Sequence, residues 1–248
     1  MLGRARQLTA AATVLALAVL AGAPAAIPPE RAAPSAAAAT TAARVTDGRF
    51  ELPSTVDPSK PMRWPACRPI EYRINPTDMP KGMTATVEHA MGVLARQTGV
   101  RFRYAGRTSR TFSSATHAST PTITIAFTSK THAAGQTFGG AGGEVGVGGS
   151  VGAWMTSEGR TVEGITSGRV LLWSRFSGPR TGAGVGWQAL VLHEVGHALN
   201  LAHRGGTTSI MHPTLTASTP GRYTAAEVRA LKQVLQTTHC DYAAWARL

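Results

Sequence analysis

Apolar and polar residues alternate in three short segments of this chain. Between the first two segments lies a stretch whose apolar residues recur at the spacing of an α-helix. In each alternating segment Ile, Val, Tyr or Phe takes every second position: residues 70–74, 100–104 and 123–127. This period of two is typical of strands with one buried face, whereas the apolar residues within 83–94 recur at helical spacing. The strand, helix, strand order predicts a right-handed crossover between two parallel strands.

Two further segments complete the expected order of elements. Residues 170–173 form a continuous apolar run, Val-Leu-Leu-Trp, which suits a strand covered on both faces. Thr224 and Glu227 have the spacing of a capping box. Apolar residues then follow at helical spacing through residue 235, so we expect a mixed α and β domain that ends in a helix.

The first 50 residues differ in composition from the rest of the chain. Residues 1–23 have a basic start, an apolar stretch and the small residues Ala21-Gly22-Ala23, as in a secretory signal peptide. Residues 24–50 are rich in Ala and Pro and poor in large apolar residues, which predicts a disordered linker. Residues 51–248 have the length of one catalytic domain with one core. We therefore expect a secreted, extracellular protein without a stable membrane anchor.

The most specific chemical pattern is His193-Glu194-x-x-His197-x-x-Asn200-x-x-His203. Residues four apart lie on the same side of an α-helix, with Cβ atoms roughly 5–6 Å apart, so His193 and His197 can bind one metal ion. His203 would point away on a continued helix. The chain must therefore reverse at Asn200, a residue that tolerates left-handed backbone angles. Three imidazoles and one open position predict a single catalytic Zn²⁺.

Glu194 is the candidate general base. It follows His193 on the same predicted helix, too far round to join the ligands but able to reach a water molecule at the fourth position of the metal. An HExxH pattern alone can also arise by chance on an ordinary helix. The third histidine argues against chance, and so does a second signal further along the chain.

That signal is the segment Ser209-Ile210-Met211-His212-Pro213. With the histidine pattern it resembles the metzincin metalloproteases, in which a Met-turn lies beneath the metal, and Pro213 makes it most similar to the matrixins. The resemblance implies an α+β (α/β-like) fold: a twisted, mostly parallel sheet with an antiparallel edge strand, an active-site helix, a Met-turn with Met211 as apolar floor, and a C-terminal helix. The chain departs from the family at Asn200, where Gly is usual, and at His212, where Tyr is common.

Glycine is frequent between residues 139 and 152. A flexible surface loop is one interpretation of this stretch. In matrixin-like enzymes the corresponding region holds the edge strand that borders the cleft, and an extended peptide can add to such an edge through backbone hydrogen bonds. The resemblance makes residues 145–150 the candidate strand. It predicts a substrate cleft that includes Val145, Gly146, Val147, Gly148, His212 and Pro213, with packing at the turn as the other role for His212.

The chain contains two cysteines, Cys67 and Cys240. In an oxidising compartment a disulfide between them is the main prediction, because closing so long a loop contributes on the order of 4–5 kcal/mol. The alternative comes from the matrixin resemblance: Cys67 within Pro65-Ala66-Cys67-Arg68-Pro69 would occupy the open zinc position, which leaves Cys240 unpaired.

The formal net charge is +12. The arginines are scattered and are not interleaved with aromatic residues, so we expect no nucleic-acid partner. A basic surface favours weak binding to anionic cell-wall polymers or acidic substrates, while an ordinary solvated surface explains the charge equally well. Acidic residues form no calcium-loop pattern, so structural Ca²⁺ or a second Zn²⁺ is not predicted. We expect a monomer.

The sequence therefore predicts a secreted zinc endopeptidase that acts on peptides or proteins, with Glu194 as general base. A zinc-peptidase class with a downstream Glu as third ligand would need Glu227, which the capping box already explains. The alternative from another class is a secreted, cell-wall-associated binding protein that keeps a metalloprotease fold without proteolysis. The intact Glu194 favours the enzyme.

Overall fold

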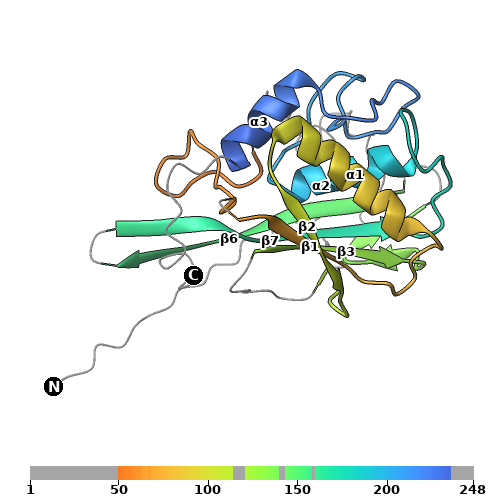
Figure 1. The fold of residues 1–248 in the computed structure, drawn as a ribbon, viewed down its shortest axis with the longest axis horizontal. Helices are drawn as coiled ribbons and strands as arrows, with labels where there is room; N and C mark the ends of the chain where they lie inside the picture. The colour runs from red at the N-terminus through yellow and green to blue at the C-terminus, as the bar shows by residue number, and fades with distance from the viewer. Residues whose placement is uncertain (1–49, 67, 114–120, 140–142, 158–159, 236–248) are drawn as a thin grey trace, which may run out of the picture.

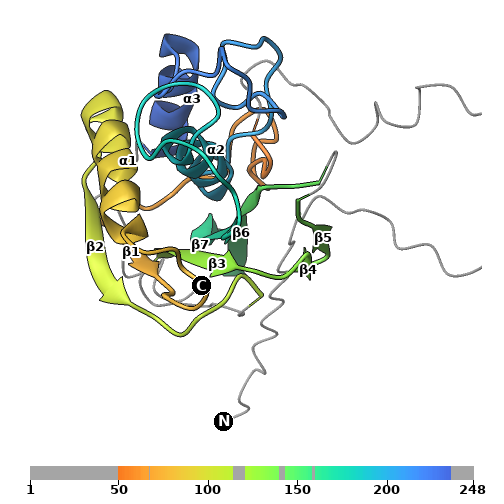
Figure 2. The same cartoon turned by 90° about the vertical axis from the view of Figure 1, so that its right-hand side faces the viewer.

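The computed structural model describes residues 50–66, 68–113, 121–139, 143–157 and 160–235. In this part of the chain three helices cover one face of a five-stranded sheet (Figures 1 and 2). The predicted α+β class is confirmed. The expected signal peptide and all but the last residue of the expected linker lie outside the described residues. None of the described helices is long and apolar enough to cross a membrane.

The sheet has the strand order β2-β1-β3-β7-β6. Its strands, in that order, are Phe102–Arg107, Ile70–Ile74, Thr122–Thr128, Arg160–Trp173 and Gly146–Ser157. β1 runs parallel to β2 and β3, and β3 runs parallel to β7, whereas β6 pairs antiparallel with β7 at the edge. The parallel crossover and the antiparallel edge strand are both as predicted.

The helices α1 and α3 follow from their apolar spacing. α1 (Met83–Thr98) connects β1 to β2 and buries Met83, Val87, Met91 and Leu94 in the main hydrophobic core. α3 (Ala225–Leu235) begins with the predicted capping box. The Thr224 N–H donates to Glu227 Oε2 at 2.6 Å, and the Glu227 N–H donates to Thr224 Oγ1 at 3.3 Å.

The hairpin of β6 and β7 is longer than the sequence suggested. β7 begins at Arg160 rather than at residue 170, and β6 runs to Ser157 rather than to residue 150. The hairpin projects beyond the other strands in Figure 1. Its backbone hydrogen bonds do not depend on an apolar pattern, which explains why the glycines and polar residues gave no signal. The short strands β4 (His132–Ala133) and β5 (Gln136–Thr137) were also not predicted.

Helix α2 (Trp187–Ala198) lies beside α1 on the same face of the sheet and packs on β6 and β7, and all of its residues are buried (Figure 2). The apolar members, such as Leu190, Val191 and Val195, belong to the main core. Burying a polar side chain is unfavourable unless the chain or a ligand satisfies it. The histidines and the glutamate that α2 carries therefore need partners, and these partners define the site.

Candidate metal centre

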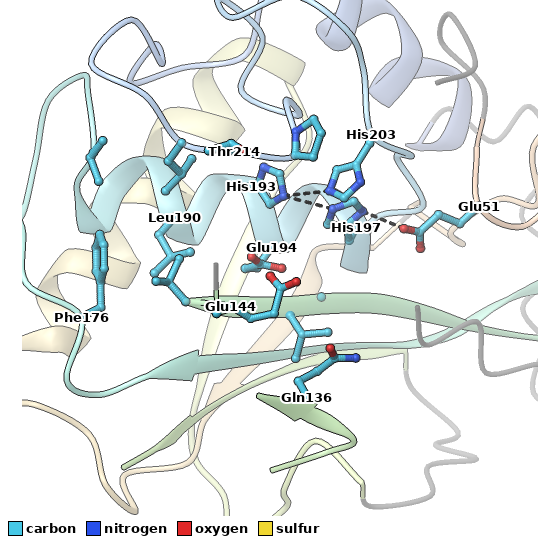
Figure 3. A pocket seen from close by; sticks show the side chains of 18 residues that line it. Glu51, Gln136, Glu144, Phe176, Leu190, His193, Glu194, His197, His203 and Thr214 are labelled. Carbon is cyan, nitrogen blue, oxygen red and sulfur yellow. Dashed lines mark hydrogen bonds and ion pairs between the residues drawn. The ribbon is translucent and has the colours of Figure 1, made fainter. Parts of the chain in front are cut away.

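Three histidine side chains from two parts of the chain meet at one point (Figure 3). α2 supplies His193 and His197, and the segment after it supplies His203. His193 Nε2 lies 3.2 Å from His197 Nε2 and 3.3 Å from His203 Nε2. The structure thus brings together the three residues that the sequence indicated as metal ligands.

The remaining ring nitrogens of the two helical histidines fix their tautomers. His193 Nδ1 lies 2.7 Å from the Ile210 carbonyl oxygen, and His197 Nδ1 lies 2.8 Å from that of Leu201. A carbonyl oxygen can only accept, so each neutral ring carries its proton on Nδ1 and a lone pair on Nε2. Tetrahedral ligands at ~2.05 Å from Zn²⁺ lie ~3.3 Å from one another. The donor set and its spacing therefore fit zinc.

The three imidazoles differ in basicity. Burial, then the neighbouring rings His197 and His203, lower the pKa of His193 well below its ordinary value. Burial and His197 likewise lower the pKa of His203 to about 3. Burial alone would lower the pKa of His197, but Glu51, whose Oε1 lies 2.7 Å from Nδ1, raises that pKa to about 9. A cation that binds Nε2 of His197 must displace its second proton.

The chain reverses at Asn200, which has a φ of 80° and is fully buried. The Asn200 N–H donates to the His197 carbonyl oxygen at 2.8 Å, and the Leu201 N–H donates to that of Gly196 at 2.8 Å. This pair of bonds is a Schellman motif, whose left-handed residue is usually Gly. The predicted bend is confirmed, and it directs the chain back so that His203 reaches the other two ligands.

Glu194 lies against the edge strand β6. A Cβ atom on Gly146 would lie 2.6 Å from Glu194 Oε1, and one on Gly148 would lie 2.1 Å from the Glu194 carbonyl oxygen. Only glycine lets the strand approach the helix this closely. Two of the glycines that the sequence suggested for substrate access therefore have a packing role as well.

The carboxyl group of Glu194 is buried, and its pKa is raised to about 8. Burial is the main cause, Glu144 and Glu51 add to it, and His197 acts in the opposite direction. Within the residues that the structure describes, the carboxylate has no hydrogen-bond partner. A carboxyl group with a pKa near neutrality that borders a cleft can both accept and donate a proton.

The Met-turn passes beneath α2 between the ligands. Met211 is fully buried, and its Sδ lies 2.3 Å from where a Cβ on Gly196 would be, so the thioether packs directly on the helix backbone. Glu227 holds the turn in place: its Oε1 accepts from Ser209 Oγ at 2.5 Å and from the Met211 N–H at 3.1 Å. Because both oxygens of Glu227 serve the turn and the helix cap, this residue is not a metal ligand.

The histidines and Glu194 border an open cleft of about 440 Å³. Most of the predicted cleft residues line it, namely Val145, Gly146, Val147, Gly148 and Pro213. His212 is not among the lining residues. Its Nδ1 lies 2.8 Å from the carbonyl oxygen and 3.1 Å from the backbone nitrogen of Thr214, which assigns His212 to the turn.

Other lining residues had no signal in the sequence. Glu51 and Glu144 bring carboxylates to the cleft, and one wall is apolar, with Phe176, Val185, Leu190 and Leu215. None of these residues has a ligand-like spacing from the histidines, so only the folded arrangement identifies them. Cys67 and Cys240, the predicted disulfide, both lie outside the described residues.

Comparison with known protein families gives a result that agrees with this geometry. The family model described as Matrixin, of peptidase family M10, matches residues 63–234, which include all three histidines, Glu194 and the Met-turn. No curated protein matches the chain. The match extends over more than half of the 248 residues. Together with the convergent histidines, it shows that this chain belongs to the matrixin family.

Proposed function

We propose that this protein is a secreted zinc-dependent endopeptidase. Its family supports a zinc metallopeptidase, and one observation carries the proposal: the Nε2 atoms of His197 and His203 lie 3.2 and 3.3 Å from that of His193, beside a buried carboxylate in an open cleft. Catalytic zinc sites have three protein ligands and one position for water or substrate, whereas structural sites have four protein ligands. The histidine arrangement matches the catalytic type.

His193, His197 and His203 would hold the ion. When bound, Zn²⁺ polarises a carbonyl group and lowers the pKa of a bound water to about 7. The rings are held for this role by the carbonyl oxygens of Ile210 and Leu201. Such outer contacts fix the orientation of a ligand histidine.

Glu194 would accept the proton of the attacking water and return it to the leaving amine. Its carboxyl group lies in the cleft next to the ligands and is free of hydrogen bonds to the described residues. Without a cation its pKa is about 8. A nearby positive charge favours the carboxylate, so a bound cation lowers that pKa toward the range in which a base works at neutral pH.

The substrate would bind as an extended peptide along β6. This strand is at the edge of the described sheet, and residues 145–148 lie in the cleft wall. Backbone groups on an unpaired edge can hydrogen-bond to an added strand. The apolar wall around Leu190 and Leu215 offers space for an apolar side chain of the substrate.

Export and partners are further parts of this proposal. The composition of residues 1–23 supports a signal peptide, and the +12 charge supports weak binding of a monomer to anionic wall polymers. N-terminal sequencing of protein from the culture medium tests the first part. Retention on anionic polymers at low and high salt, with sedimentation of the free protein, tests the second.

The central experiment measures cleavage of an unstructured protein by the full chain with Zn²⁺, with a chelator, and after the substitution Glu194→Gln. We expect the chelator to stop cleavage, and Glu194→Gln to lower the rate by about 10²–10⁴-fold at unchanged zinc content. Glu163→Gln, a change on the hairpin, is the matched control. A wild-type protein that holds one zinc ion and cleaves nothing would support the binding-protein alternative. Full activity of Glu194→Gln would falsify the assigned base.

A further inference from the structure

The first described residues of the chain lie on the bend that follows the zinc-binding helix. Phe50 forms an antiparallel bridge with Leu201, and the Glu51 N–H donates to the Asn200 carbonyl oxygen at 3.3 Å. Figure 3 shows the side chain of Glu51 reaching His197 from the side opposite the apolar wall. A segment far from the motif in sequence is thus part of the metal centre.

The side chain of Asn200 anchors this segment. Its Oδ1 accepts from the Leu52 N–H at 2.6 Å, while its Nδ2 donates to the carbonyl oxygens of Leu52 at 2.9 Å and Met62 at 3.0 Å. Glycine would adopt the left-handed backbone angles of this position equally well. It could not form these three hydrogen bonds. Asn200, where the family usually has Gly, therefore adds a side chain that holds the segment around Leu52 and Met62 to the bend.

Anchoring places the carboxylate of Glu51 behind one ligand only. Glu51 Oε1 lies 2.7 Å from His197 Nδ1, and both side chains are largely buried. The Nδ1 proton of His197 is shared between this carboxylate and the Leu201 carbonyl oxygen. In contrast, Nδ1 of His193 faces the Ile210 carbonyl oxygen alone among the described contacts.

We propose that Glu51 is a positioning residue for the metal ligand His197, and that Asn200 acts on the metal through Glu51. A carboxylate that accepts the Nδ1 proton fixes the ring and increases electron donation from Nε2 to a metal. It also balances part of the cation's charge in a buried site. The inference rests on the proposed zinc site. It further implies that any maturation cut must leave Phe50 to Leu52 attached to the domain.

The test is the dissociation constant of Zn²⁺, measured by competition with a chromogenic chelator on the full chain. We expect Glu51→Ala to weaken zinc binding by about 10–100-fold, as removal of an outer-shell partner typically does. Glu51→Gln keeps the shape and an acceptor oxygen but loses the charge, so we expect a smaller loss. Because this variant is isosteric, it tests the inference even if Glu51→Ala does not fold.

Glu163→Gln is the control for general loosening of the same segment. Glu163 Oε2 accepts from the Thr55 N–H at 2.6 Å and from the Thr55 hydroxyl, so it also holds residues near the start of the domain, but it does not contact His197. We expect this variant to bind zinc within twofold of wild type. Equal losses in Glu163→Gln and Glu51→Gln would overturn the positioning role.

A double-mutant cycle separates positioning from simple stability. Asn200→Gly should weaken zinc binding in the wild-type background and have little further effect in the Glu51→Ala background, because its influence passes through Glu51. Independent, multiplicative losses would contradict this route, as would zinc binding by folded Glu51→Gln and Glu51→Ala at wild-type affinity. Failure of the wild-type protein to bind Zn²⁺ at all would instead reject the proposed function, and the two failures are therefore distinguishable.

Discussion

The two sides of the cleft are built in opposite ways. One side comes from the segment 193–213, where the three ligands, the general-base candidate and the Met-turn beneath them follow one another within a short stretch of sequence, and of which the histidine ligands, Glu194 and Pro213 line the cleft. The other side combines Glu51 with residues 144–148 of the edge strand, which only the fold brings near the histidines. We therefore expect substitutions on the first side to remove chemistry, and substitutions on the second side to alter its geometry or strength.

The largest expected effect is on the first side. His203→Ala removes one of three ligands, so we expect zinc affinity to fall by more than the ~10–100-fold typical of an outer contact, with loss of peptidase activity. Metal analysis and zinc titration of the purified protein measure this. If His203→Ala lost no more zinc affinity than Glu51→Ala does, the two sides of the cleft would not differ in the way described.

The next effect concerns Glu194, where the two sides meet. Its pKa is about 8 in the fold against an ordinary 4.5, so the folded state holds a proton that the unfolded state releases. The contribution of Glu194 to the free energy of unfolding of chelator-treated protein should then fall by up to roughly 5 kcal/mol as the pH rises from about 4.5 to 8, whereas the lowered pKa values of His193 and His203 act in the opposite direction below about pH 6.5. Denaturant unfolding across this range measures it. Glu194→Gln removes this contribution, so the difference in stability between the variant and wild type should change with pH, and a difference that stays constant would contradict the assignment.

A smaller effect is expected from the contact between strand and helix. Gly148→Ala places a methyl group 2.1 Å from the Glu194 carbonyl oxygen, so β6 must move away from α2. We expect a loss of about 1–3 kcal/mol in stability together with reduced kcat/KM. Gly92→Ala in α1 is the control, because its nearest neighbour is the flexible side chain of Arg96 at 3.4 Å, and it should be neutral or slightly stabilising. Similar behaviour of the two variants would show that close approach at β6 is unimportant.

The smallest expected effect is on substrate choice. Glu144 is an exposed residue whose carboxyl group lies in the cleft near Glu194, in a protein that is otherwise strongly basic. Glu144→Gln should lower kcat/KM several-fold for peptides with Lys or Arg near the cleaved bond, corresponding to about 1 kcal/mol of lost attraction. Matched peptides with Gln in place of Lys should be unaffected. Equal changes for both peptides would mean that Glu144 acts on geometry rather than charge.

The same division explains what the sequence could predict. Alternating apolar residues identified β1 and β3, and helical spacing identified α1 and α3, because in these elements burial follows the local pattern. The hairpin of β6 and β7 was underestimated, because its length depends on pairing between two segments. Pairing preferences of this kind are weak in single sequences.

At the site, the spacing of the histidines indicated the ligands and the bend at Asn200. It did not indicate Glu51 or the second role of the Asn200 side chain, since both depend on a contact across 148 positions of the chain. The one local sign of this role is Asn200 itself, a polar residue at a left-handed backbone position that glycine would adopt equally well. Such a residue suggests that its side chain has a partner elsewhere.

That long-range contact also has a temporal consequence. Residues 50–52 leave the ribosome early, but the surface that receives them exists only after Asn200 and Leu201 have been synthesised. Closing a loop of this length is slow and entropically unfavourable until the intervening sheet has assembled. The nascent polypeptide therefore cannot bring Glu51 to His197 before Leu201 has been synthesised, which makes this contact a late step in the assembly of the histidine cluster.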